Sequence, residues 1–276
     1  MNRKGNGMDK LRVSSEPYWE AHPGNGPYLL LLHGFLCSRA QWIPNIEALS
    51  YVTRPVIVEL LGHGRSPAPE SPAAYHPEGY IEAFEKIREH LGISEWLLCG
   101  HSLGAGITMR YALQYPERII AQVFTNTTSA LAETDSASET RRAVAQFAEN
   151  LLQVGHEGLE RLPIHPVNAH RLRADVREAL VRDAADISLL GAANAMRYTL
   201  PEVSVREEIH RNKVPTLLVC GRLEKRFKPF RDYAEAHMPL LEIVDLDAGH
   251  PVNIEAAEGF NDSLAVFFRK HISDRK

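Results

Sequence analysis

Short apolar runs that alternate with helical patterns constrain this 276-residue chain more than any other feature of its sequence. Such alternation is typical of strand-helix-strand units, in which parallel strands are buried on both faces and read as continuous apolar runs. The sequence therefore predicts an α/β fold with a mostly parallel central sheet flanked by helices. The predicted strands are residues 28–32 (YLLLL), 55–60 (PVIVEL), 96–99 (WLLC), 119–124 (IIAQVF), 216–220 (TLLVC) and 241–244 (LEIV).

Helical periodicity fills the gaps between these runs. Apolar residues recur at helical spacing in residues 42–49 and 80–91, which predicts amphipathic helices. From 125 to 212 the strand signal disappears and only helical patterns remain. We therefore expect an α/β core formed by residues 1–124 and 213–276, with an inserted helical cap at 125–212.

Composition and charge exclude several classes of function. The chain is 44% hydrophobic and 24% charged, as in an ordinary globular protein, and its net charge of -4 provides no basic field for nucleic acid. The ten N-terminal residues are not followed by the apolar segment of a secretion signal, and no apolar run reaches membrane-spanning length. We therefore expect a cytoplasmic protein whose partner is a small-molecule substrate, with no nucleic acid and no membrane. The sequence sets no oligomeric state.

The cysteines and histidines provide no sign of a bound metal or cofactor. Cys37, Cys99 and Cys220 cannot all pair, and two of them lie within predicted strands, so we expect reduced core thiols rather than the alternative of a catalytic cysteine. His165 and His170 lack a partner cluster of carboxylates or cysteines, so no metal site is predicted. No glycine-rich phosphate loop occurs, and no cofactor is expected.

One serine lies where a nucleophile would be exposed. Residues 100–104 (GHSLG) match the pattern G-x-S-x-G and stand directly between the WLLC strand and a predicted helix that ends before Pro116. Glycines permit the sharp turn that lifts Ser102 out of the sheet edge, and the helix N-terminus brings the Leu103 N–H toward an oxyanion. The alternative is an ordinary turn with a chance serine, but the context favours Ser102 as nucleophile.

A serine nucleophile needs a base, and histidine is suited to that role because its pKa lies near neutral pH. His250 lies in the loop after the last predicted strand, where a base falls in chain order after a serine in this kind of sheet. The orienting acid should follow the preceding strand, where Glu224 is the candidate and a solvated loop charge is the alternative. Asp245 and Asp247 are second choices because they lie close to His250 in sequence.

The loop after the first long strand, HGF, should supply a second oxyanion donor. The backbone N–H of Phe35 is the candidate. His33 in the same loop, His63 in GHGRS and His101 beside the nucleophile are interpreted as structural residues that form local hydrogen bonds.

The substrate pocket is predicted from residues beside the nucleophile and in the cap. His101 precedes the serine, and the cap offers Phe147, Met196 and Tyr198, which suit a small or medium hydrophobic substrate. The alternative is that these apolar cap residues pack against the core, which is the commoner use of such a stripe.

Five motifs in order, LLLLHGF, GHGRS, GHSLG, CGRLE and AGHPVNIE, resemble the α/β-hydrolase superfamily over nearly the whole chain. The resemblance implies a capped serine hydrolase of the α/β-hydrolase fold. It also implies a triad of Ser102, His250 and Glu224, and an oxyanion hole formed by Phe35 and Leu103. The chain departs from the commonest pattern where DxPGHG reads ELLGHG and where the acid is Glu rather than Asp.

Three functions are compatible with these residues. The first is hydrolysis of a carboxylic ester or lactone, as in carboxylesterases. The second is carbon-carbon bond hydrolysis or triad-assisted elimination, because HGFLCSRAQW and CGRLEKRF are similar to a menaquinone-pathway family, the succinyl-hydroxycyclohexadiene-carboxylate synthases. That family commonly has Arg where this chain has Gly106 and Tyr where it has His101. The third is a non-catalytic receptor for a small ligand.

Overall fold

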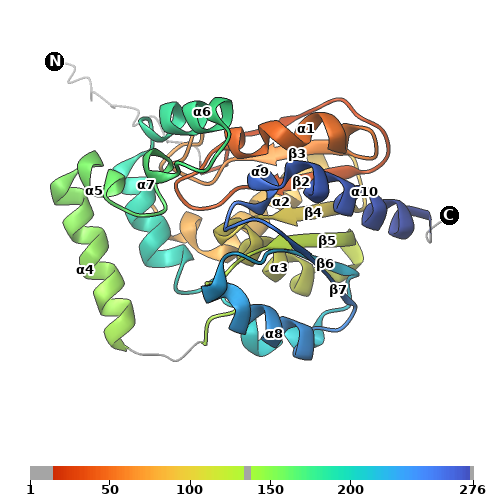
Figure 1. The fold of residues 1–276 in the computed structure, drawn as a ribbon. Helices are drawn as coiled ribbons and strands as arrows, with labels where there is room; N and C mark the ends of the chain where they lie inside the picture. The colour runs from red at the N-terminus through yellow and green to blue at the C-terminus, as the bar shows by residue number, and fades with distance from the viewer. Residues whose placement is uncertain (1–14, 134–137, 274–276) are drawn as a thin grey trace, which may run out of the picture.

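A single sheet of seven strands forms the centre of the computed structural model, which describes residues 15–133 and 138–273. Its strands are β1 (Trp19–Ala21), β2 (Tyr28–Leu32), β3 (Arg54–Val58), β4 (Trp96–Gly100), β5 (Ile119–Thr125), β6 (Thr216–Gly221) and β7 (Leu241–Leu246). Their order across the sheet is β1-β3-β2-β4-β5-β6-β7 (Figure 1). Strand β1 is antiparallel to β3, and all the remaining neighbouring pairs are parallel.

Six of these strands are the six that the sequence predicts, and the predicted ends lie within two residues of the observed ones. The apolar runs succeed as a signal because β4 and β5 are buried along their whole length. The edge strand β1 escapes prediction because it is only three residues long and half-exposed, and it contains no continuous apolar run.

Helices cover both faces of the sheet. The helices of the core are α1 (Ile43–Ser50), α2 (Pro77–His90), α3 (Leu103–Gln114), α8 (Lys228–His237), α9 (Val252–Glu255) and α10 (Ala257–Ser273). Successive residues of a strand point to opposite faces, so Leu30 of β2 packs in one apolar cluster with Phe84 of α2, whereas Leu31 packs in another with Phe260 of α10. The predicted α/β fold, with a mostly parallel sheet flanked by helices, is confirmed.

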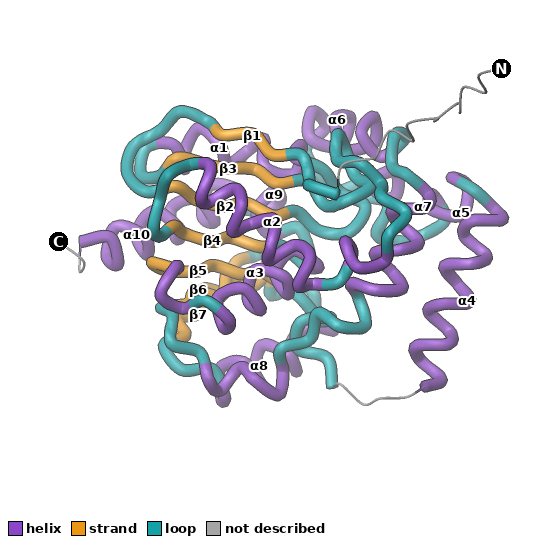
Figure 2. Tube along the Cα trace, turned by 180° about the vertical axis from the view of Figure 1, so that it is seen from behind, coloured by secondary structure: helices purple, strands orange, loops and turns teal. Residues whose placement is uncertain are grey.

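The stretch between β5 and β6 is helical and contains no strand among its described residues. Its α-helices are α4 (Ser138–Val154), α5 (His156–Glu160), α6 (Ala174–Ala184) and α7 (Leu189–Asn194). In Figures 1 and 2, α4, α5 and α7 lie together to one side of the sheet. Leu151 of α4 and Ile187 belong to the same buried cluster as Leu60 and Tyr75, so the inserted helices share a hydrophobic core with the rest of the chain.

A glycine pair sets how closely α7 approaches the core. A Cβ added at Gly191 would lie 2.5 Å from the Cα of Gly62, whose φ of +76° itself favours glycine. The amide of Ser188 donates a hydrogen bond to the Gly62 carbonyl over 2.9 Å at the same crossing. Any side chain on α7 here would push two backbones apart.

We therefore expect Gly191→Ala to lower the free energy of unfolding by about 1–3 kcal/mol, the usual cost of overpacking a buried contact. Gly158→Ala in α5 is the matched control, because its new methyl group would meet side chains and no backbone atom, with the end of Leu151 nearest at 3.1 Å and Val154 at 3.4 Å. Urea unfolding of the two variants measures the difference. Equal stability of Gly191→Ala and wild type would show that α7 is not held at this crossing.

The expectation that no secretion signal is present concerns the ten N-terminal residues, which lie outside the described residues. None of the helices within 15–133 and 138–273 is both long and apolar enough to cross a lipid bilayer.

Candidate active site

Ser102 occupies a strained turn between β4 and α3. Its φ and ψ are 52° and -116°, a combination that costs a non-glycine residue about 1–3 kcal/mol and that clusters at functional sites. The chain turns this sharply because Gly104 lets α3 press against the end of β2, where a Cβ would lie 2.5 Å from the carbonyl oxygen of Leu32. The Ser102 side chain makes no capping hydrogen bond to α3. Its hydroxyl is therefore left for the cavity that it lines.

Glu224 and His250 meet although they lie 26 residues apart. Nδ1 of His250 is 2.8 Å from Oε2 of Glu224, whose side chain is 7% exposed. Burial alone would raise the pKa of Glu224, but hydrogen bonds from His250, Asn126 and Arg226 outweigh it and bring this pKa to about 2. Because the carboxylate is ionised, the proton of a neutral His250 resides on Nδ1, and Nε2 is left as the acceptor.

Asn126 holds the Glu224 carboxylate in place, and the sequence analysis did not identify Asn126 as a site residue. It follows β5 directly, and its Nδ2 donates to Oε2 of Glu224 over 2.9 Å and to the Gly221 carbonyl over 3.0 Å. Its Oδ1 accepts from the Gly221 amide over 2.9 Å. The sequence did contain a signal for Asn126. It is a polar residue directly after a buried parallel strand, and that strand neighbours the one followed by the predicted acid.

The two alternative acids have other partners. Asp245 forms a two-pronged ion pair with Arg231 at 2.8 and 3.0 Å, and Asp247 pairs with Arg222 at 2.6 Å. Within the described residues, Glu224 is the carboxylate that His250 contacts.

Ser102 and His250 open into one cavity of about 230 Å³. This volume is smaller than the roughly 300–1,000 Å³ of pockets for drug-sized ligands, so it suits a small substrate. The lining residues are Gly34, Phe35, Cys37, Gln41, His101, Ser102, Pro163, Ile164, Pro166, Ala169, Leu172, Leu180, Arg226, His250, Pro251 and Ile254.

The loop that carries Phe35 is fixed on both sides of this residue. The Gly34 amide donates to Oε1 of Gln41 over 3.1 Å, and the Leu36 amide donates to Nε2 of His63 over 3.2 Å. These bonds fix the backbone on either side of Phe35, which lines the cavity. On the other side of Ser102, Leu103 is the first residue of α3, where backbone N–H groups have no partner within the helix.

The histidines of the neighbouring loops form the expected local hydrogen bonds. Nδ1 of His33 donates to the Gly34 carbonyl over 2.8 Å, while its Nε2 accepts from the Leu60 amide over 3.1 Å. His63 also bridges two backbone groups. Burial is the main cause that lowers their pKa values, to about 3 for His33 and about 4 for His63. Both rings are therefore neutral and serve to shape the loops.

His101, by contrast, faces the cavity. Its Nδ1 lies 2.7 Å from the hydroxyl oxygen of Thr125, and its ring packs edge-on against His250 with 4.9 Å between centroids. Burial, followed by the proximity of His250, lowers the pKa of His101 well below its ordinary value. His101 is therefore uncharged and places no positive charge beside His250.

The predicted pocket residues of the inserted segment lie elsewhere. Phe147, Met196 and Tyr198 do not line the cavity: Phe147 is 41% exposed, whereas Met196 and Tyr198 pack against the core cluster. This prediction is wrong because a helical apolar stripe reports packing between elements. The lining residues include Pro163 and Leu172, which lie outside any α-helix and have no periodicity to reveal them.

The cysteines are unsuited to nucleophilic chemistry. All three are free thiols, and Cys37 lines the cavity. Burial raises the pKa of Cys37 and of Cys220 to about 12 and shifts that of Cys99 in the same direction. None is therefore a thiolate at neutral pH.

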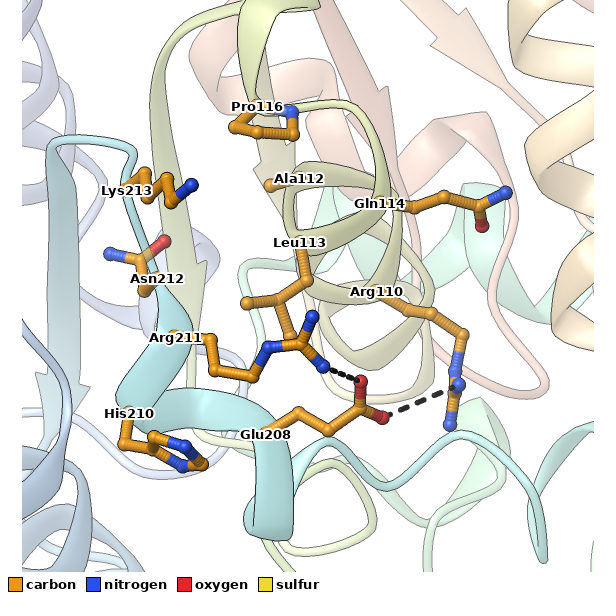
Figure 3. Close-up of a pocket in the computed structure, with 10 residues that line it drawn as sticks. All are labelled: Arg110, Ala112, Leu113, Gln114, Pro116, Glu208, His210, Arg211, Asn212 and Lys213. Carbon is orange, nitrogen blue, oxygen red and sulfur yellow. Dashed lines mark ion pairs between the residues drawn. The ribbon is translucent and has the colours of Figure 1, made fainter.

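A larger cavity of about 650 Å³ lies between the end of α3 and residues 206–213. Figure 3 shows Glu208 between Arg110 and Arg211, with which it forms ion pairs at 3.9 and 3.5 Å, whereas Lys213 lies apart from them. It contains no serine, cysteine or carboxylate paired with a histidine, so it offers no comparable chemistry.

Among the described residues, one group has the composition of a metal site. Ligand atoms of His76, Glu78 and Glu202 lie within 4.8 Å of one another. Nδ1 of His76 already lies 2.6 Å from Glu202, and the Arg110 guanidinium lies 3.9 Å from Glu78, so both carboxylates already have partners in the protein.

Comparisons with known proteins relate the chain to one family. The model of the family described as alpha/beta hydrolase fold matches residues 27–257. The chain is 26% identical to a putative 2-succinyl-6-hydroxy-2,4-cyclohexadiene-1-carboxylate synthase of Bacillus subtilis (strain 168), over 89% of this chain and 91% of the relative. It is also 26% identical to an uncharacterized carboxylesterase, nap, of the same organism, over 89% of this chain and 80% of the relative. The structure of MenH from S. aureus superposes with a TM-score of 0.80, at 19% identity, over 92% of this chain and 98% of the other.

Proposed function

Because the chain belongs to the α/β-hydrolase family, we propose that it is a serine hydrolase that cleaves a carboxylic ester or lactone through Ser102, His250 and Glu224. The observation that carries this proposal is the 2.8 Å contact between His250 and the buried, ionised Glu224. His250 lines the same cavity as Ser102, which lies in a strained turn. The carboxylesterase among its relatives supports the same reaction class.

In the proposed reaction, Ser102 Oγ attacks the substrate carbonyl while Nε2 of His250 accepts the hydroxyl proton. The oxygen that becomes negative is stabilised by the backbone N–H groups of Phe35 and Leu103. His250 then returns the proton to the departing alkoxide. Water, deprotonated by His250, releases the acid from Ser102 and restores the site.

The inserted segment, about 125–212, acts in this proposal as a cap over the cavity. Pro163, Ile164 and Leu180 belong to it and line the cavity together with residues of the core such as Phe35 and Ile254. An apolar cover excludes water from the reacting carbonyl and strengthens the hydrogen bonds at the oxyanion. Its approach to the core also restricts the substrate to small or medium acyl groups.

A second candidate is triad-assisted elimination, favoured by the similarity to the putative synthase over most of the chain. In that reaction the same His250 would take a proton from carbon, and no acyl group would reside on Ser102.

Labelling with a fluorophosphonate, followed by mass spectrometry of the labelled peptide, tests for an activated Ser102. We expect stoichiometric labelling of that residue together with hydrolysis of short-chain esters or lactones. Labelling without hydrolysis of any ester or lactone would favour elimination or carbon-carbon cleavage. A folded protein that takes no label would favour a ligand receptor.

A further inference from the structure

Arg226 is the cavity-lining residue with a permanent charge. The rest of the wall is formed by apolar residues, Gln41, Ser102 and the two histidines, His101 and His250. Gln41 is already engaged through its amide with the Gly34 backbone and Asn253. A substrate that enters this cavity therefore meets one cation at its wall.

Glu224 orients the Arg226 guanidinium but accepts a hydrogen bond from only one of its nitrogens. Its Nε donates to Oε1 of Glu224 over 2.6 Å, while the other carboxylate oxygen serves His250 and Asn126. In the described part of the chain, no acceptor takes a hydrogen bond from either Nη of Arg226. The side chain is 68% exposed, so these groups remain available for a ligand.

The ion pair between Arg226 and Glu224 also affects which substrate charge the cavity can accept. An ionised Glu224 beside the site would repel an anionic substrate, and Arg226 offsets that charge at the wall. A guanidinium presents its N–H groups as a planar fork that matches a carboxylate. An exposed ion pair adds little to stability, so folding alone gives little reason for a cation here.

We propose that Arg226 binds a free carboxylate on the substrate, so that this enzyme prefers esters or lactones whose acyl portion carries a second, ionised carboxyl group. The inference rests on the proposed serine hydrolase and adds its substrate class. In the bound complex the carboxylate meets the Nη groups while the ester carbonyl meets Ser102 and the Phe35 N–H. The apolar wall contacts the methylene groups between them.

Two methyl esters with the same number of acyl carbons test this preference, monomethyl glutarate with a carboxylate at its far end and methyl pentanoate with a methyl group. Methanol release gives kcat/KM for each, and their ratio is the readout. We expect the wild type to prefer the glutarate ester, and Arg226→Gln to reduce this ratio about tenfold, as for the loss of one hydrogen bond to a charged group. Arg226→Lys should restore part of the preference, and added salt should weaken it.

The ratio separates recognition from an effect on the acid, because a disturbed Glu224 slows both esters equally. Lys225→Gln is the matched control, since it removes the neighbouring positive charge from a residue that does not line the cavity. An unchanged ratio in Arg226→Gln, or a wild type without preference, would overturn the proposal.

Fluorophosphonate labelling keeps this failure distinct from failure of the hydrolase itself. Absence of both labelling and hydrolysis would remove the catalytic premise. If Ser102 is labelled but neither ester turns over, protection against labelling by the two esters replaces the kinetic ratio. Stronger protection by the glutarate ester, lost in Arg226→Gln, would support the carboxylate site, and equal protection would refute it.

Discussion

Replacing Ser102 with alanine is expected to lower kcat by a factor on the order of 10⁶, as removal of a serine nucleophile does in other triad hydrolases, and to abolish fluorophosphonate labelling. No other side chain lining the cavity can replace the hydroxyl, because Cys37 is held as a thiol by a pKa of about 12. The residual rate would come from the oxyanion donors and from substrate binding alone.

The fold should tolerate this change. The Ser102 side chain makes no capping hydrogen bond, and alanine keeps the strained backbone of the turn, so the urea midpoint should match that of wild type. Ser263→Ala on α10 is a control whose serine bonds to the Gly259 carbonyl on the same helix. Esterase activity in purified, folded Ser102→Ala above about 1% of wild type, a level far beyond the residual rate expected without a nucleophile, would place the nucleophile elsewhere.

The sequence predicts the sheet well because its strands are buried on both faces. Strand β4 reads WLLC and is buried throughout, so its apolar run is unambiguous, and the GHSLG turn that follows it locates Ser102. The order of elements then places the loops of Glu224 and His250 at the same edge of the sheet. The contact between these two side chains required the structure, because order along the chain says nothing of side-chain direction.

The cavity wall was beyond sequence reasoning for a different reason. Periodicity in the inserted segment identified residues such as Phe147, which faces solvent on α4. The wall is built from residues such as Pro163, whose place depends on how α5 and α6 dock onto the core. Arg226 was visible in the sequence only as one charge in a charged loop, and its pairing with Glu224 distinguishes it from Lys225.

The substitution Glu224→Gln is expected to reduce kcat by about 10⁴-fold, as loss of the acid's charge does in a serine protease. The carboxylate now accepts from His250 and Asn126 on one oxygen and from Arg226 on the other. An amide has one accepting oxygen, so its NH₂ must face a donor on one side. If it faces His250, Nδ1 becomes the acceptor, the proton moves to Nε2, and the ring can no longer take the proton of the nucleophile.

The opposite orientation of that amide turns the NH₂ toward the Nε–H of Arg226, so the hydrogen bond between these two side chains is lost. Asp247→Asn is the control, because it removes a carboxylate from the neighbouring loop that pairs with Arg222 instead.

The pKa of Glu224 is lowered from 4.5 to about 2, so its ionisation stabilises the folded state above pH 4.5 and this contribution is lost as the pH falls toward 2. Steady-state kinetics at neutral pH therefore compare a fully charged acid with a neutral amide. A Glu224→Gln enzyme within tenfold of wild-type kcat, with Asp247→Asn slower than it, would transfer the orienting role to Asp247.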